Sequence, residues 1–285
     1  MSTWFGTDTG AQFNPNVWAA ETNKLYKRNL VIAGGCTDKK GDSKVRGFTN
    51  MYIPNITGLN STAPRSRATI AATMDGGLTY DANTDTYTTL TIDKYYYQGI
   101  GLGEFEDNVS GYDILNEYTP VVAEALARYF DYTLADLFST LTNTIGALTD
   151  PPTEDDFLYL AQLLLDADVP RDNWMWFISN PLWGSLMKQQ KLTSSDFVGS
   201  KPLETGAILN LYGTPAKQSN NLEGTAAAGH YNALLRKNCI IYAQILAPKT
   251  RRFDDIDLLA EKLVMSSIWG VAVNRQDSGA QLKGP

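Results

Sequence analysis

The most regular apolar pattern in the chain runs from residue 120 to residue 145, where large apolar side chains recur every three or four positions. This spacing is typical of one face of an α-helix. Thr119 can cap such a helix and Pro120 suits its first position, so the pattern predicts a helix of about 39 Å from Pro120 to Ile145, long enough to cross a sheet as a spine. The apolar positions are Val122, Leu126, Tyr129, Phe130, Leu134, Leu137, Phe138, Leu141 and Ile145.

Before this helix, two segments alternate apolar and polar side chains, as half-buried strands do. The first runs from Lys44 to Ile53 and ends at Pro54, and the second runs from Tyr87 to Asp93. The span between them holds few large apolar residues and is far longer than an ordinary hairpin loop. Such a span is either disordered or packed on another subunit, and its abundant Thr, Ile and Tyr favour the second.

After the spine, the pattern changes to short strands and helices. Thr153 and Asp156 form a capping-box pattern before a core helix from Phe157 to Leu165. Trp174 to Ile178 is a continuous apolar run that predicts a buried strand, and Asn180-Pro181 follows it as cap and first residue of another helix. Further strands are expected at 239–246 and 262–274, with a polar loop at 218–229. The fold class is therefore α+β (mixed α/β).

Charge is unevenly distributed along the 285 residues. The whole chain carries a net charge of −7, yet residues 1–46 hold seven basic groups and four acidic ones. A pI near 4.8 argues against nucleic-acid binding by the whole protein. The basic residues Lys24, Lys27 and Arg28 instead suggest contacts of an N-terminal arm, although a solvated basic loop explains them equally well. We find no secretory signal or membrane span and expect folding in the cytoplasm.

Residues suited to catalysis, cofactor binding or metal binding are scarce. His230 is the only histidine, and a packed or loop position explains it best. Cys36 and Cys239 are expected to be reduced and structural. The run Gly99-Ile100-Gly101-Leu102-Gly103 is followed by glutamate where a dinucleotide fingerprint needs a small residue. We therefore predict no catalytic, cofactor or metal site, and a protein that is not an enzyme.

The order of these features resembles the major capsid proteins of tailed bacteriophages, which share the Hong Kong 97-like fold. Each matching stretch is weak by itself, but their order and spacing cover nearly the whole chain. The stretches are Ala125-Leu126-Ala127-Arg128-Tyr129-Phe130-Asp131, Phe177-Ile178-Ser179-Asn180-Pro181-Leu182-Trp183, Thr193-Ser194-Ser195-Asp196-Phe197-Val198-Gly199, Tyr212-Gly213-Thr214-Pro215 and Ile268-Trp269-Gly270-Val271-Ala272-Val273.

The resemblance implies a division of the chain. Residues 1–43 would form the N-terminal arm, 44–98 an extended β-loop on a neighbouring subunit, and 99–152 a peripheral domain with the spine helix. Residues 153–248 would form the axial domain, and 249–285 would return to the peripheral domain.

The implied function is self-assembly into pentamers and hexamers of an icosahedral shell in the virion. The shell would enclose double-stranded DNA without sequence-specific binding, together with portal and possible scaffolding or decoration proteins. Between subunits, Arg65 and Arg67 are candidates to pair with Asp254, Asp255 and Asp257, although solvated charges explain these residues equally well. Two other readings stay open: an encapsulin-like nanocompartment shell, and a carbohydrate-binding or hydrolytic phage tail protein.

Overall fold

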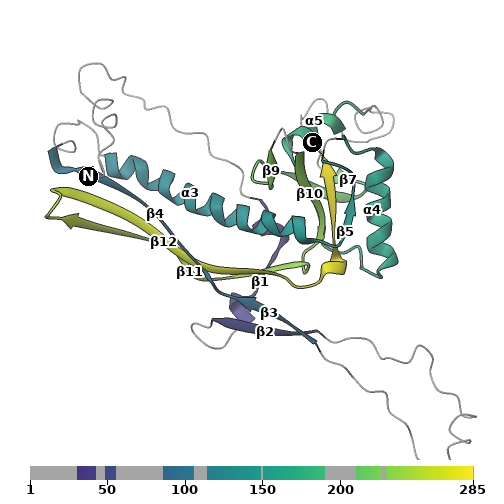
Figure 1. Ribbon diagram of the computed structural model, residues 1–285, viewed down its shortest axis with the longest axis horizontal. Helices are drawn as coiled ribbons and strands as arrows, with labels where there is room; N and C mark the ends of the chain where they lie inside the picture. The colour runs from purple at the N-terminus through teal and green to yellow at the C-terminus, as the bar shows by residue number, and fades with distance from the viewer. Residues whose placement is uncertain are drawn as a thin grey trace, which may run out of the picture.

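Two β-sheets of different size organise the chain, with the long helix α3 crossing from one to the other (Figure 1). The computed structural model describes residues 31–42, 49–55, 86–105, 114–148, 150–189, 210–225 and 229–284. Both helices and strands contribute to the core, so the predicted mixed α+β class is confirmed.

The first sheet has four strands in the order β1-β11-β12-β4. Its centre is a long antiparallel hairpin of β11 (Ile240–Asp255) and β12 (Ala260–Val273). On one side β4 (Lys94–Gly103) pairs antiparallel with β12 over its whole length. On the other side the short β1 (Thr37–Asp38) pairs parallel with the start of β11.

Helix α3 (Ile114–Asp136) lies along one face of this sheet (Figure 1). Its apolar residues Val122, Leu126 and Phe130 pack against Trp269 of β12 and its neighbours. The Trp269 indole N–H also donates to the Thr133 hydroxyl at 3.2 Å. A tryptophan that is both packed and hydrogen-bonded fixes how the helix lies on the sheet.

A separate ribbon of β2 (Asn50–Asn55) and β3 (Thr86–Thr91) lies on the opposite face. Leu90 of β3 packs there against Ile241 and Ala243 of β11. The contact needs Gly270 of β12, because a Cβ at this position would overlap the carbonyl oxygen of Thr91. The first half of the β11–β12 hairpin is thus covered on both faces.

The second sheet has seven strands along the path β5-β13-β10-β6-β8-β7, with β9 beside β10. Its strands are β5 (Asn143–Ile145), β6 (Trp174–Ile178), β7 (Asn210–Leu211), β8 (Thr214–Gln218), β9 (Gly224–Thr225), β10 (Gly229–Arg236) and β13 (Gly279–Gly284). Helices α4 (Glu154–Asp166) and α5 (Asn180–Leu186) supply the apolar residues that pack on one face, including Phe157, Leu160 and Leu182. The other face packs against the end of α3 and residues 31–36.

Short 3-10 turns complete the described chain at Ala33–Gly35, Lys40–Asp42, Leu137–Thr140 and Gln276–Ser278. The turn at Leu137–Thr140 marks the main departure from the predicted spine. Helix α3 begins at Ile114, contains Pro120 within it and ends at Asp136, whereas the sequence predicts Pro120 to Ile145. The apolar spacing continues past Asp136 because Phe138 and Leu141 fill the core beside the seven-stranded sheet.

Other local predictions agree closely with the structure. Thr153 and Asp156 form the expected capping box, in which the Thr153 N–H donates to the Asp156 carboxylate at 2.7 Å. Strand β6 has the predicted limits of Trp174 and Ile178. The cap of α5 differs by one residue, because the Ser179 hydroxyl rather than Asn180 accepts from the Leu182 N–H.

Two of the domain boundaries that the resemblance implies, at residues 98 and 248, fall inside observed strands. Strand β4 runs across residue 98, and β11 begins at Ile240 and runs across residue 248. In addition, β13 pairs with β10 and β5 in the seven-stranded sheet, whereas the resemblance implies that residues 249–285 return to the peripheral domain. The last strand is buried on both sides, so it completes the second core rather than the first.

Candidate assembly surface

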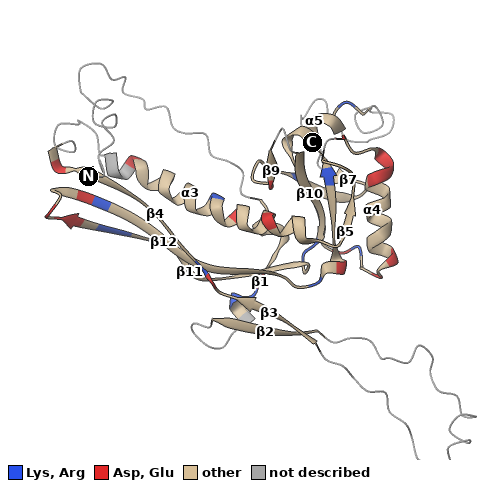
Figure 2. Cartoon of the chain, viewed as in Figure 1, with Lys and Arg blue, Asp and Glu red and all other residues tan. Residues whose placement is uncertain are grey.

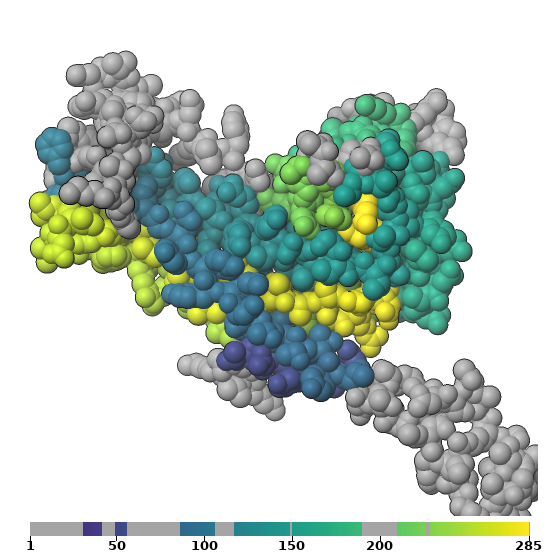
Figure 3. Space-filling model, viewed as in Figure 1, coloured from purple at the N-terminus to yellow at the C-terminus, as the bar shows by residue number. Residues whose placement is uncertain are grey.

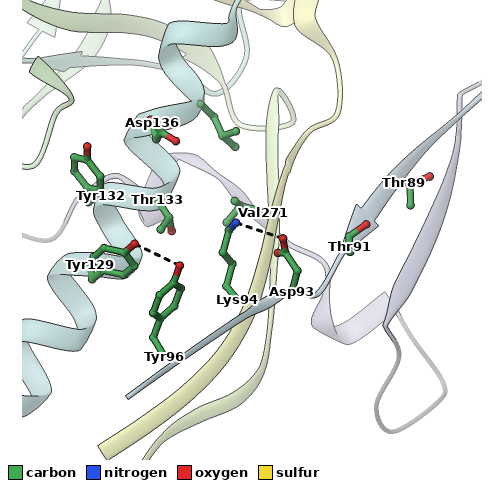
Figure 4. A pocket seen from close by; sticks show the side chains of 11 residues that line it. Thr89, Thr91, Asp93, Lys94, Tyr96, Tyr129, Tyr132, Thr133, Asp136 and Val271 are labelled. Atoms are coloured by element: carbon green, nitrogen blue, oxygen red, sulfur yellow. Dashed lines mark hydrogen bonds and ion pairs between the residues drawn. The ribbon is translucent and has the colours of Figure 1, made fainter. Parts of the chain in front are cut away.

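Two clefts flank the exposed side of α3, and their linings are rich in tyrosine. One has a volume of about 300 Å³ and is lined by residues of β3, β4 and α3, several of which are drawn in Figure 4. Across it, the Tyr129 hydroxyl donates to the Tyr96 hydroxyl at 3.4 Å. The other cleft, of about 660 Å³, lies between β4, α3 and the residues around Asn221.

The chemistry of these linings gives no catalytic arrangement. The hydrogen bond with Tyr96 raises the pKa of Tyr129, and burial raises the pKa of Tyr132, so both phenols are protonated at neutral pH. The nearest ion pair joins Lys94 to the adjacent Asp93 at 3.4 Å and is exposed. Across the described ranges, the structure contains no group of three or more His, Cys, Asp or Glu side chains suited to a metal ion.

His230 and the two cysteines have structural surroundings. His230 lies in β10, where it is half-buried and pairs in register with Gly284 of β13. Cys36 and Cys239 are free thiols within one apolar cluster. Burial raises the pKa of Cys239 to about 12 and that of Cys36 further. Both thiols are therefore protonated and poorly nucleophilic at neutral pH.

The most exposed apolar surface lies at the tip of the β11–β12 hairpin. Ile256 and Leu259 in the connecting turn are 85% and 65% exposed, and Phe105 just after β4 is 80% exposed. The Glu104 N–H donates to the Leu259 carbonyl at 2.8 Å, which joins the end of β4 to the turn. We call Phe105, Ile256, Leu258 and Leu259 the apolar tip. An exposed apolar cluster at the end of a projecting ribbon is typical of a protein contact.

Charged side chains surround the apolar tip, as the red and blue segments at the end of the hairpin show in Figure 2. Lys249, Arg251 and Arg252 lie along the exposed part of β11, followed by Asp254 and Asp255. The Lys262 ammonium pairs with the Asp255 carboxylate and lowers the pKa of that carboxyl below its usual range. Asp255 also accepts from the Asp257 N–H at 3.1 Å, so it stabilises the turn.

The structure therefore locates only part of the predicted contact set. Asp254, Asp255 and Asp257 lie together at the tip, with Asp254 and Asp257 exposed and Asp255 partly occupied by Lys262. Arg65, Arg67, Lys24, Lys27 and Arg28 lie outside the described residues. The sequence predicted the acids here as contact residues, but it did not predict the apolar tip beside them. The available signal was the run Ile256-Asp257-Leu258-Leu259, in which apolar residues occupy a turn.

In the space-filling view, the yellow-green β11–β12 hairpin reaches one end of the molecule and the lobe of α4 and α5 forms the other (Figure 3). In the described part of the chain, no helix is both long and apolar enough to cross a membrane.

Three solved phage structures share this architecture over nearly the whole chain. A chain from Mycobacterium phage Che8 is 22% identical and matches with a TM-score of 0.79, covering 95% of this chain and 97% of that chain. The capsid structure of cyanophage P-SCSP1u gives a TM-score of 0.77 at 17% identity, with 94% and 92% covered. The mature capsid of bacteriophage PhiM1 gives 0.71 at 12% identity, with 100% and 96% covered.

The chain thus has the fold seen in these phage capsid structures. No family model matches the sequence, and no curated protein matches it. Because the sequence identities to these structures are low, the structural similarity establishes the fold alone.

Proposed function

We propose that this chain is the major capsid protein of a tailed bacteriophage, with the Hong Kong 97-like fold. Many copies would assemble as pentamers and hexamers into the icosahedral shell that encloses the double-stranded DNA genome. The observation that carries this proposal is the match, over more than nine-tenths of both chains, to structures of phage capsids. In this assignment the chain is a structural protein of the virion and not an enzyme.

The arrangement of elements supports the finer division of the fold. Helix α3 corresponds to the spine, and the β2–β3 ribbon corresponds to the base of the extended β-loop. The four-stranded sheet with α3 corresponds to the peripheral domain, and most of the seven-stranded sheet corresponds to the axial domain. The N-terminal arm would comprise residues 1–43, with portal, scaffolding or decoration proteins as further partners and assembly in the host cytoplasm.

Within the shell, we assign a subunit contact to the apolar tip and its acids. Arg65 and Arg67 of a neighbouring copy would pair with Asp254 and Asp257, while Asp255 holds the turn through Lys262. Exposed ion pairs contribute only about 0 to 1 kcal/mol each, but a closed shell repeats each contact many times. The apolar tip would add buried area to every such contact.

A charge exchange tests this pairing. Changing Arg65 and Arg67 to glutamate should lower shell yield, and changing Asp254 and Asp257 to lysine in the same chain should restore part of it. The matched control places the same lysines at Asp150 and Asp166, two exposed acids on either side of α4. Absence of recovery, or equal recovery with the control, would argue against the pairing.

The arm residues Lys24, Lys27 and Arg28 are proposed to contact an acidic neighbour or the packaged DNA. Replacing all three with glutamine should impair assembly or genome retention, and wild-type assembly should weaken with added salt because exposed charges are screened. Unchanged assembly and packaging would favour a solvated basic segment.

In some members of the family that this chain resembles, neighbouring subunits are joined by an isopeptide bond between a lysine of the extended loop and an asparagine in the loop preceding the last strand. Here residues 45–93 contain no lysine and residues 247–267 contain no asparagine. We therefore predict no such cross-link. Mature particles boiled in detergent should give one band near monomer mass, and a ladder of covalent oligomers would contradict this.

The decisive experiment is electron microscopy of the expressed chain. Closed icosahedral particles of megadalton mass are expected. Particles that hold an enzyme rather than nuclease-protected DNA in the native source would favour the encapsulin-like alternative. A discrete monomer or trimer under all assembly conditions would overturn the shell proposal and favour a tail protein.

A further inference from the structure

Asp131, near the end of α3, is the one buried acidic or basic residue in the part of the chain that the structure describes. Its side chain is 1% exposed. One carboxylate oxygen accepts hydrogen bonds from the backbone N–H groups of Ile32 and Ala33 at 3.1 and 3.2 Å. The other accepts from the side-chain amide of Asn221 at 3.2 Å.

These three partners come from distant parts of the chain. Residues 31–36 lead directly into β1, at the edge of the four-stranded sheet. Asn221 lies in the connection from β8 to β9, and the neighbouring Ser219 N–H donates to the Ile178 carbonyl at the end of β6 in the seven-stranded sheet. A single carboxylate thus joins the spine helix to segments that belong to both sheets.

The surroundings of this carboxylate are apolar. Ile32, Leu134 and Leu222 belong to one buried cluster around it, and each is at most 5% exposed. Burying a carboxylate costs free energy unless a cation or hydrogen bonds offset the loss of water. No ion pair of Asp131 occurs within the described ranges.

The titratable groups on the packed elements do not supply a counter-charge. On residues 31–36 this group is Cys36, whose pKa is raised by burial and by the negative charges of its neighbours, Asp131 among them, so the thiol is neutral. On the β8–β9 connection it is Glu223, whose pKa is raised by burial and by Asp136. On α3 the nearby groups are Arg128, which is exposed, Tyr132 and Asp136.

We propose that Asp131 is a pH-sensitive clamp, which holds residues 31–33, α3 and the Asn221 loop together more firmly when it is protonated than when it is ionised. The geometry gives the clamp its three contacts, and the lack of a cation beside Asp131 among the described residues makes its ionised form costly. Once Asp131 is ionised, the junction between the two sheets is consequently held at reduced strength, which permits rearrangement. Acidification removes this cost.

The direction of the pH effect follows from the balance at this group. Burial raises the pKa of Asp131 above its usual value, against the hydrogen bonds from Asn221, Ala33 and Ile32 that lower it. A carboxyl group with a raised pKa in the folded state contributes its full stability below the unfolded pKa. That contribution is lost as pH rises through the folded pKa.

The variant Asp131→Asn isolates the charge. The introduced amide oxygen can still accept from Ile32 and Ala33, while its N–H₂ group requires an acceptor on Asn221. Such an acceptor is available, because the Asn221 side-chain oxygen is buried and has no hydrogen-bond partner among the described residues. Rotation of the Asn221 amide therefore preserves the contacts without the buried charge.

The test is thermal unfolding of the unassembled full-length chain between about pH 4 and about pH 8, a range that brackets the titration of a raised carboxyl group. The melting temperature of Asp131→Asn should match wild type at the acidic end and exceed it by a few degrees at the basic end. Asp136→Asn, an exposed carboxylate on the same helix, is the matched control. A difference between Asp131→Asn and wild type that does not vary with pH would overturn the clamp.

A second variant keeps the proposal testable if the first is poorly folded. Asn221→Asp places two carboxyl groups face to face, so the melting temperature should fall steeply as pH rises. Adding Asp131→Asn to it leaves one carboxylate and should return most of the loss. Hydrogen exchange at the Ile32 and Ala33 amides should slow on acidification more than the intrinsic rate change predicts. Equal melting curves for Asn221→Asp and wild type at every pH would refute the clamp, and none of these outcomes depends on shell assembly.

Discussion

In both halves of the β11–β12 hairpin the two strands are paired by backbone hydrogen bonds, but β11 is buried in the first half and exposed in the second. In the first half, Ile240, Ile241 and Ala243 are fully buried, with α3 on one face and the β2–β3 ribbon on the other. In the second half, every residue of β11 from Ala247 to Asp254 is exposed. Strand β11 thus passes from a closed core to an open edge, while β12 stays packed against α3.

This difference separates what the chain does for itself from what it offers to others. Burial of apolar side chains gives the first half its stability within one subunit. In the second half, β12 still packs under α3 through Leu263 and Met265, whereas β11 is uncovered. The hairpin then ends in the apolar tip, which burial against another molecule would cover. Changes in the first half should therefore affect folding, and changes in the second half should affect assembly.

The largest expected effect on folding comes from Trp269 in the covered half. Trp269→Ala removes a fully buried ring that packs on Phe130 and Tyr96. Substitutions of this kind cost about 3 to 5 kcal/mol. Chemical denaturation of the unassembled chain should detect this loss. A cost below that of an exposed tryptophan substitution would show that the covered half is not the core.

A smaller loss is expected from Gly270→Ala, because the added methyl group would meet the Thr91 carbonyl and push the β2–β3 ribbon away from the sheet. Overpacking of this kind costs about 1 to 3 kcal/mol. Gly41→Ala, at a glycine with open space around the position of a Cβ, is the control and should be near neutral. Equal stability of the two variants would contradict close contact at Gly270.

The open half should give the reverse result. Ile256→Ser with Leu259→Ser should change the free energy of unfolding by no more than about 0.5 kcal/mol, as exposed positions usually do. The same double variant should form few or no particles in a sizing column. Normal assembly would remove the apolar tip from the contact, and severe unfolding would mean that the tip stabilises its own subunit.

The smallest effect concerns the Asp255–Lys262 pair in the open half. Because Lys262 lowers the pKa of Asp255, its contribution is present at neutral pH and is lost as pH falls through that lowered pKa. Amide exchange in the turn after Asp255 should then accelerate on acidification relative to its intrinsic rate. Lys262→Met should abolish this pH dependence, and its persistence in that variant would assign it to another group.

Local signals predicted the second lobe better than the first sheet. The α4 cap and strand β6 were predicted correctly because Thr153 with Asp156, and the run from Trp174 to Ile178, carry their signals within a few residues. Strand β4 was missed because glycines alternate along half of it, and its partner β12 lies some 160 residues further along the chain. Such pairing depends on long-range packing, which no local pattern reveals.

The candidate contact residues were predictable only in part. The acids at 254–257 were visible as charges, but the exposure of Ile256 and Leu259 depends on where the hairpin extends beyond α3. The burial of Asp131 could not be predicted from the sequence. It arises from residues 31–33 and Asn221, which lie some 90 or more positions away.

The position of β13 in the seven-stranded sheet has a consequence for synthesis. This strand lies between β10, which is made earlier, and β5, which is made earlier still. The sheet cannot close until residues 279–284 have been synthesised, so β5 and the β13-facing edge of β10 stay unpaired until then. Open strand edges invite pairing with other chains, so the strand that completes the sheet also protects this lobe from aggregation.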